Sequence, residues 1–314
     1  MKNKILNNRG IALITVILII AILVAVVIEL NRSSRADIYD AANVSDGIKL
    51  TYIAKSGFYG AAAVLTTSKN NYDTLRDDWA HMETISLQSN TLFTDGYFIA
   101  SIEDETGKIP LNKIVYENGY YKMLLRLLEQ PEFGLDERIA TEIADSIVNW
   151  ISSTDNPADD AYYASLNPPY EPKNAPIDCI EELLMIKGIT KEIYYGTKEK
   201  PSLAQYVTAD SDDGAINVNT APKMILRSLA EGISPELADK MDEYRTNAGN
   251  DLSGIKWFQN MAGVTIDPEL LLTVNSTYFK IISTGQMSNM AKTINGIVKK
   301  SSNKSVQTIR WRQD

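Results

Sequence analysis

A short acidic stretch carries the side chains best suited to bind a metal ion. Segment 149–163 reads NWISSTDNPADDAYY and holds Asp155, Asn156, Asp159 and Asp160. Calcium takes about six to eight oxygen ligands from carboxylates, carbonyl groups and water, and this stretch supplies several of them. The alternative is a solvated loop whose acids cap a neighbouring helix. Asp155, Asp159 and Asp160 are therefore a candidate calcium site, with both interpretations open.

Other acidic residues form two further clusters. Glu103, Asp104 and Glu105 come just before a turn and Lys108. Carboxylates can serve as general acid and base, but no nucleophile or base partner is identifiable beside them. We expect them at the end of a strand, where surface charge is common. The second cluster consists of Asp210, Asp212 and Asp213. We expect it to be a solvated linker.

The composition limits the possible functions. The chain of 314 residues is 44% hydrophobic and 23% charged, which predicts one or two sizeable cores and argues against a disordered protein. One histidine, His81, and one cysteine, Cys179, leave no multi-histidine zinc site and no intramolecular disulfide. The net charge of −9 argues against binding to nucleic acid. We therefore expect a globular protein that is not an enzyme.

The N-terminal region combines a basic leader with a long apolar run. Residues 11–28 carry no charge and span about 27 Å at about 1.5 Å per residue, close to the hydrocarbon thickness of a bilayer. A secretory signal peptide is the alternative, but its apolar part is shorter, about 7–15 residues. The sequence predicts a leader over 1–10 and one transmembrane helix over 11–30. The basic residues before the run put the N-terminus in the cytoplasm and the bulk of the chain outside it: Lys2, Lys4 and Arg9.

The apolar patterns beyond the membrane predict a mixed fold. Helical spacing continues to about Leu65. Alternation predicts a strand that begins at Tyr97 and ends near Thr106-Gly107. Strand-like alternation returns only near the C-terminus, in YFKIISTGQM, AKTINGIVKK and SVQTIRWRQD, whereas 116–275 reads as helices. We expect the late strands to complete the sheet that begins at Tyr97.

This order of elements predicts an α+β fold, in which a long N-terminal helix packs on a small antiparallel sheet interrupted by a large all-α insert. The expected α+β domain has its first part over 31–115 and its C-terminal strands over 276–314. The insert is expected over 116–275. Its short amphipathic helices predict two subdomains, about 116–208 and 214–275, that meet near ADSDDG.

Several stretches together resemble the pseudopilin K family of type II secretion systems. The basic leader that ends in Gly10 and the apolar helix after it are similar to the start of type IV pilins and pseudopilins. DETGKIPLN at 104–112, NPPYEPKNAPIDCIEELLMIKGI at 167–189 and INVNTAPKMIL at 216–226 resemble the K family in the same order. The likeness covers nearly the whole chain. It implies a pilin-like helix and sheet with a SAM-like, helix-hairpin-helix-like insert.

The resemblance also implies processing, location and partners. A prepilin peptidase would cut between Gly10 and Ile11, and the new N-terminus would be methylated. The protein would be single-pass in the bacterial inner membrane, with its globular domain in the periplasm. As a minor pseudopilin at the pseudopilus tip, it would join the I-type and J-type minor pseudopilins and initiate or cap filament assembly for protein export. The secreted substrate and the outer-membrane channel are further implied contacts.

Thr15 stands at the fifth position of the apolar run, where pilins usually carry Glu. In the family that Glu meets the free amine of a neighbouring subunit, because a lone charge in lipid is costly. K-type pseudopilins also lack the Glu, and a subunit at the tip has no neighbour above it. The alternative is a tolerated Thr15 whose hydroxyl bonds back to the helix backbone. The large insert favours the tip.

The calcium interpretation changes when the resemblance is considered. K-type relatives bind calcium in acidic loops of this domain, and many of them read Trp-Ile-Asp-x-Asp. This chain has Ser152 and Thr154 after Trp150-Ile151, so two carboxylates are missing. Four aromatic residues nearby and later in the insert are expected to serve packing: Trp150, Trp257, Tyr162 and Tyr163.

A second resemblance provides the alternative function, a membrane-anchored DNA-uptake receptor. INVNTAPKMILRSLAEGISPELADKMDEYR resembles the helix-hairpin-helix repeats of competence-type DNA-binding proteins. Those modules bind phosphate through a Gly-hydrophobic-Gly turn, but the turns at 232–234 and 188–190 lack the second Gly, and Glu231 and Glu236 would repel phosphate. We expect no nucleic-acid partner. The polar residues before the helix that starts near Pro222 are predicted to serve turns and caps: Asn217, Asn219 and Thr220.

Overall fold

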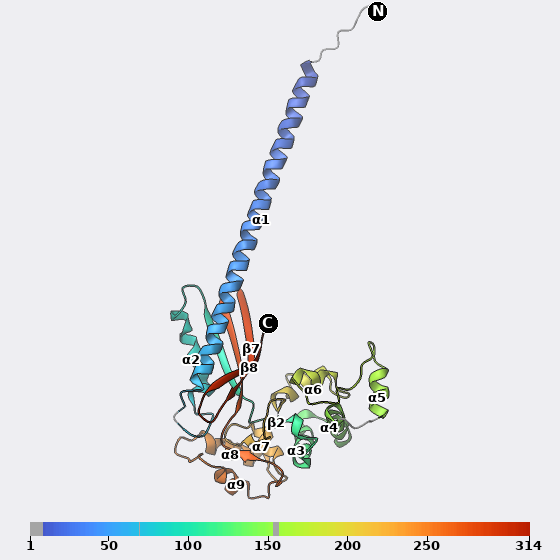
Figure 1. The fold of residues 1–314 in the computed structure, drawn as a ribbon, viewed down its shortest axis with the longest axis vertical. Helices are drawn as coiled ribbons and strands as arrows, with labels where there is room; N and C mark the ends of the chain where they lie inside the picture. Colours follow the sequence, from blue (N-terminus) through green and yellow to red (C-terminus); the bar gives the residue numbers. More distant parts are fainter. Residues whose placement is uncertain (1–8, 69, 153–156) are drawn as a thin grey trace, which may run out of the picture. The chain divides into compact units, whose positions relative to one another are not determined.

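The structure is a computed structural model that describes residues 9–68, 70–152 and 157–314 (Figure 1). The chain divides into two units, residues 1–52 and 53–314.

The first unit contains most of one long helix. Helix α1 (Arg9–Val64) has 56 residues, and no proline interrupts it, since the first proline of the chain is Pro110. Its large apolar side chains between Ile11 and Leu30 are 49–68% exposed. Within the described residues, α1 is the one helix long and apolar enough to cross a membrane. Its end at Val64 confirms the predicted end near Leu65.

The second unit contains a four-stranded antiparallel sheet in the order β1-β6-β7-β8. Its strands are β1 (Tyr97–Asp104), β6 (Tyr278–Met287), β7 (Met290–Lys300) and β8 (Val306–Gln313). Strands β1 and β6 are neighbours, with Tyr97 opposite Gln286 and Asp104 opposite Phe279. The late strands therefore complete the sheet that begins at Tyr97, as the alternation of apolar residues predicts.

The last part of α1 packs against this sheet. Ile53 and Phe58 are buried in one cluster with Phe98 of β1, and burial of such side chains is the main stabilising contribution, about 1.5–3 kcal/mol each. At Gly57 a Cβ would lie 2.2 Å from Ser283 Oγ and 2.6 Å from the Phe98 ring. The close approach of helix and sheet therefore requires glycine at this position.

Short helices cover the outer edge of β1. They are η1 (Asp78–His81), α2 (Met82–Ser86) and η2 (Leu87–Thr91). The Ser89 hydroxyl donates to the Phe98 carbonyl at 2.8 Å and accepts from the Phe98 amide at 2.9 Å. Ser86 Oγ accepts from the Ala100 amide at 3.0 Å. These side chains satisfy backbone groups that an edge strand would otherwise expose.

The insert lies between β1 and β6 in the chain and is mainly helical. Its helices are η3 (Leu111–Lys113), α3 (Asn118–Leu128), η4 (Pro131–Phe133), α4 (Glu137–Ile151), α5 (Pro157–Ala164), η5 (Ile180–Met185), α6 (Lys191–Tyr195), η6 (Leu203–Gln205), α7 (Lys223–Ser228), α8 (Pro235–Thr246) and α9 (Lys256–Ala262). Side-chain caps begin several of them: Asp136 accepts from the Ile139 amide at 2.8 Å, and Ser234 accepts from the Leu237 amide at 3.2 Å. One cluster of buried residues runs from Ile109 to Val274. The expected domain boundaries and the two helical subdomains stay predictions.

Two short strand pairs distinguish the insert from an all-α domain. β2 (Ile109–Pro110) pairs in parallel with β3 (Val207–Thr208), and β4 (Ile216–Asn217) pairs in parallel with β5 (Leu272–Thr273). Each strand has two residues, too few for alternation to reveal in the sequence. The β2-β3 pair joins the start of the insert to its middle, and the β4-β5 pair joins its middle to its end.

Candidate functional site

The predicted processing site lies in the first turns of α1. Gly10 is helical and exposed, and a Cβ placed there would meet nothing within 4 Å. The Ile11 side chain is 64% exposed. The Thr15 hydroxyl donates to the Ile11 carbonyl at 2.9 Å. This is the bond expected if Thr15 is simply tolerated in the helix, the alternative to a tip-specific role. The helix itself therefore satisfies the polar group of Thr15.

The candidate calcium ligands are only partly described. Asp155 lies outside the described residues. Asp159 and Asp160 belong to helix α5, and their side chains also lie outside the described part of the structure. Among the residues that are described, no three or more His, Cys, Asp or Glu side chains form a group that could hold a metal ion. The calcium site stays a prediction.

A polar junction joins the sheet to the insert. Strand β1 ends at Asp104, and the chain then enters the insert, from which it returns to β6 through residues 274–277. The Glu105 amide donates to the Tyr278 carbonyl at 2.9 Å, and Thr106 Oγ1 accepts from the Thr277 amide at 2.9 Å. The segments that enter and leave the insert are therefore bonded directly to each other.

The carboxylate of Asp104 lies within this junction. Its Oδ2 accepts hydrogen bonds from the hydroxyls of Thr220, at 2.5 Å, and Ser276, and its Oδ1 accepts from the Thr106 amide at 2.8 Å. Burial raises the pKa of Asp104 to about 6, although these three donors act in the opposite direction, and the charge of Asp73 adds to the increase. The expectation of a surface carboxylate holds only in part, because Thr220 of the insert packs over the end of β1 and Asp104 is half-buried.

Asp73, from the segment after α1, is the second acid of the junction and is buried. Its Oδ2 accepts from the Ser276 amide at 2.8 Å, and its Oδ1 forms an ion pair with Lys300 of β7. Asn217 Nδ2 donates to the Ser276 hydroxyl at 2.7 Å and to the Asp73 carbonyl at 3.3 Å. We call Asp73, Asp104, Asn217, Ser276 and Lys300 the junction cluster.

Glu105 is also buried, contrary to expectation. It is 3% exposed, and its Oε1 lies 2.6 Å from Nζ of Lys108, which is 6% exposed. Burial lowers the pKa of Lys108, but the carboxylates of Glu105 and Glu103 outweigh burial and raise it. A buried charge requires such a partner. The pair is therefore structural, and no reacting group lies beside it in the described residues.

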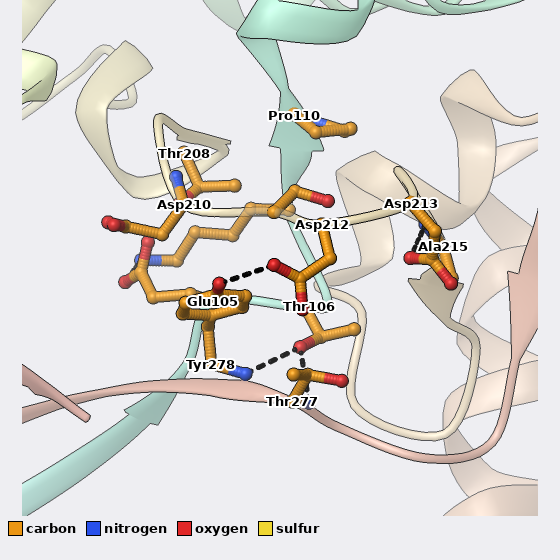
Figure 2. Close-up of a pocket in the computed structure, with 12 residues that line it drawn as sticks. Glu105, Thr106, Pro110, Thr208, Asp210, Asp212, Asp213, Ala215, Thr277 and Tyr278 are labelled. Carbon is orange, nitrogen blue, oxygen red and sulfur yellow. Dashed lines mark hydrogen bonds and ion pairs between the residues drawn. The ribbon is translucent and has the colours of Figure 1, made fainter. Parts of the chain in front are cut away.

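The acidic stretch at 210–213 connects the insert to the sheet. Asp210 accepts from both terminal nitrogens of Arg310 in β8, each at 2.5 Å, and its side chain is 10% exposed. Asp212 accepts from the Tyr278 hydroxyl at 2.7 Å (Figure 2). It also pairs with Lys299 at 2.5 Å. The prediction of a solvated linker is therefore wrong for Asp210, because β8 supplies the cation that its burial requires.

The pocket at the junction is too small for a substrate. Glu105, Thr106, Asp210 and Tyr278 are among the residues around it (Figure 2). Its volume of about 10 Å³ is about the room that one water molecule needs. The arrangement joins two parts of the fold, and its chemistry is that of ion pairs and hydrogen bonds.

The polar residues before α7 contribute more than caps. Asn217 Oδ1 accepts from the Asn219 amide at 2.9 Å, which is the predicted turn, but Asn219 also accepts from Trp257 Nε1 at 2.8 Å and donates to the Leu252 carbonyl at 3.0 Å. Pro222 is the cap residue of α7. Asn217 and Asn219 alternate with the apolar Ile216 and Val218, and this alternation is the one sequence signal of buried hydrogen bonding. The sequence did not reveal their partners.

The predicted packing role of the aromatic residues holds for three of four. Trp150 and Tyr163 are buried with ring centroids 5.6 Å apart, and Trp257 is buried and stacks on Tyr244 at 5.5 Å. Tyr162 is 36% exposed, with Lys187 Nζ 5.5 Å from its ring centroid. Tyr162 therefore lies at the rim of the packed region.

Comparison with known proteins finds one family to which the chain is similar. A model of the family "Type II secretion system (T2SS), protein K" matches residues 107–209. Type II secretion system protein K of Pseudomonas aeruginosa is 26% identical over 260 residues, which cover 77% of this chain and 74% of the relative. Protein K of Aeromonas hydrophila is 24% identical over 236 residues, 68% of this chain and 67% of the relative.

The chain is thus similar over most of its length to the type II secretion system protein K family. A chain in the crystal structure of the GspK-GspI-GspJ complex from enterotoxigenic Escherichia coli has a similar fold, with a TM-score of 0.69. The match covers 87% of this chain and 99% of that chain, at 16% sequence identity. The long helix, the antiparallel sheet and the helical insert are therefore the fold that the sequence predicts.

Proposed function

We propose that this chain is a minor pseudopilin of a type II secretion system. The observation that carries the proposal is helix α1 together with the sheet. The helix presents an uncharged, exposed surface over 11–28, and its last part packs on an antiparallel sheet that holds the insert. An anchored helix on a small sheet suits a filament subunit, and the similarity to the protein K family supports the same function.

The surface of α1 beyond the apolar run supports assembly into a filament. Ile38, Val44, Ile48 and Tyr52 are 55–65% exposed. Contiguous exposed apolar side chains commonly mark a surface that another protein covers. Helices of neighbouring subunits would provide that cover.

The location follows from the apolar run and the charges before it. A membrane anchor fits the exposed apolar side chains of α1. We place the protein in the bacterial inner membrane, with a cytoplasmic N-terminus and a periplasmic globular domain, because the basic residues precede the run. Processing by a prepilin peptidase between Gly10 and Ile11 belongs to the same proposal.

We propose the I-type and J-type minor pseudopilins as partners. The similar fold comes from a complex in which GspK is bound to GspI and GspJ. A position at the filament tip agrees with the large insert, which would prevent another subunit from stacking above it, and with Thr15 in place of Glu. The secreted substrate or the outer-membrane channel would then contact the insert.

The tip position is tested by immunogold labelling of pseudopili with antibodies against the insert. Label at a single end is the expected result, and antibodies against the major subunit should mark the whole length as a control. Label of the insert along the whole filament would refute the tip position.

The DNA-receptor alternative finds no support in the hairpin turns. Gly188 and Gly232 have φ angles of 84° and 89°, but the third residues of the turns, Thr190 and Ser234, cap helices through their side-chain oxygens. The Glu231 side chain is 90% exposed beside the second turn. An exposed carboxylate at this place opposes phosphate binding. We likewise propose a structural rather than an enzymatic role, which the similarity to a secretion-system protein supports.

A further inference from the structure

Two carboxylates of the junction cluster share one serine. Ser276 donates its backbone N–H to Asp73 and its hydroxyl to Asp104. Asp73 is 3% exposed, and Lys300, whose side chain is 11% exposed, is its ion-pair partner. Two acids and one ammonium group therefore meet where the sheet joins the insert. When both acids are ionised, this place carries a net negative charge.

In the described residues, the groups around Asp104 donate hydrogen bonds to it, but Lys300 is the one cationic side chain that pairs with an acid of the cluster. Thr220 and Thr106 are neutral donors. The charged groups nearby have partners of their own: Asp77 accepts from the Thr74 amide, Arg76 donates to the carbonyls of Arg245 and Asn250, Arg245 pairs with Asp242, and Lys108 pairs with Glu105 and Glu103.

We propose that the junction cluster is a pH-dependent lock between the sheet and the insert, which tightens when Asp104 takes up a proton and loosens when it ionises. Protonation removes the net negative charge of the cluster. The hydrogen bonds survive it, because the hydroxyls of Thr220 and Ser276 can each donate or accept. A neutral Asp104 donates one bond to a hydroxyl and keeps an acceptor for the other. The lock needs no ligand.

The sign of the effect follows from the pKa of Asp104. Burial raises it to about 6 in the closed junction, whereas a solvated carboxyl in an opened junction has the ordinary value of 3.8. Between these values the closed state binds more protons than the open state, so closure weakens as the pH rises from about 4 to about 6 and then stays level. The equilibrium constant for opening should increase about tenfold between pH 5 and pH 7.5.

Hydrogen exchange of the full chain in lipid nanodiscs tests the lock. The peptides of interest cover 104–110 and 272–280, with intrinsic exchange rates corrected for pH. We expect opening of the wild-type junction to be about tenfold rarer at pH 5 than at pH 7.5. Asp104→Asn should remove this pH dependence and protect the junction at pH 7.5 at least as well as the wild type does. Asp212→Asn, at an exposed acid of the same junction, should keep the wild-type pH dependence.

Two results would overturn the lock. One is equal protection of the wild-type junction at both pH values. The other is an Asp104→Asn variant with the same pH dependence as the wild type, which would assign the effect to another group. If Asp104→Asn does not fold, Thr220→Ala provides the second test. It removes a donor to the ionised form, so the transition should move to higher pH, and a transition that stays in place or moves lower contradicts the proposal.

Discussion

Arg310 of strand β8 forms a bidentate ion pair with Asp210 of the insert, in which each terminal guanidinium nitrogen lies 2.5 Å from a carboxylate oxygen. Two residues further along β8, Arg312 pairs with Glu181 at 2.8 Å. The two arginines share one face of the strand, since side chains alternate along it. Strand β8 therefore holds the insert at two places that lie far apart in the sequence.

Arg310→Ala should destabilise the protein. It leaves the carboxylate of Asp210, whose side chain is 10% exposed, without its cation. We expect a loss of about 1–2 kcal/mol in the free energy of unfolding, measured by denaturant titration of the detergent-solubilised chain. Lys223→Ala removes one partner of the exposed Lys223–Asp239 pair and serves as the control, with little change expected. Equal stability of both variants would show that the Arg310 pair contributes no more than a surface pair.

Replacing two glycines of α1 by alanine should change the stability of the fold in opposite directions. Gly57→Ala should destabilise the fold by about 1–3 kcal/mol, because its Cβ would overlap Ser283 and Phe98. At Gly60 a Cβ would meet nothing within 4 Å, so Gly60→Ala should be neutral or stabilising by up to about 1 kcal/mol, through the higher helix propensity of alanine. Thermal unfolding followed by circular dichroism measures both. A Gly57→Ala variant as stable as Gly60→Ala would contradict the close packing of helix on sheet.

The sequence predicts those parts of the fold that carry a periodic pattern. Helix α1 and strands β1 and β6 have long runs of helical or alternating spacing, and the structure confirms them. The junction could not be predicted, because its bonds join residues as distant as Asp73 and Lys300. Asp104 and Asp210 each lie in a short acidic cluster, a pattern typical of surface residues. Their partial burial depends on which cation or hydroxyl the fold brings to them, and no pattern along the chain predicts these partners.

Gly10→Ala should block removal of the leader. The peptidase implied by the resemblance to the protein K family needs a residue without a side chain before the cut, and Gly10 is exposed in the structure. Mass spectrometry of the membrane protein should find residues 1–10 retained. Thr15→Ala, which lies beyond the cut, should be processed normally. Efficient loss of the leader from Gly10→Ala would refute the assigned site.

Thr15→Glu should give no gain in secretion and should impair membrane insertion. The wild-type hydroxyl is satisfied by the Ile11 carbonyl, whereas a carboxylate without a partner is costly in lipid. Secretion assays and carbonate extraction of membranes measure the two effects. Thr15→Val keeps the shape without the charge and should behave as the wild type does. Increased secretion by Thr15→Glu would mean that a neighbour's amine is present, against the tip position.

If Asp155, Asp159 and Asp160 bind calcium, the ion should stabilise the region around helix α5. Removing the ion with a chelator should lower the midpoint of thermal unfolding by several degrees, and Asp159→Asn with Asp160→Asn should abolish that response. Asp239→Asn, at an exposed acid elsewhere, should retain it. A wild-type chain that is indifferent to chelator would support the alternative, a solvated loop that caps a helix.

The pairing of β1 with β6 has a practical consequence. Asp104 lies opposite Phe279, and the next amide, that of Glu105, is 2.9 Å from the Tyr278 carbonyl. The chain thus leaves the sheet and rejoins it at almost the same point, as the two arms of a hairpin would. We therefore expect the insert to be exchangeable: a tight turn in its place should close the β1-β6 hairpin, and a fluorescent protein with adjacent termini should convert the subunit into a visible marker.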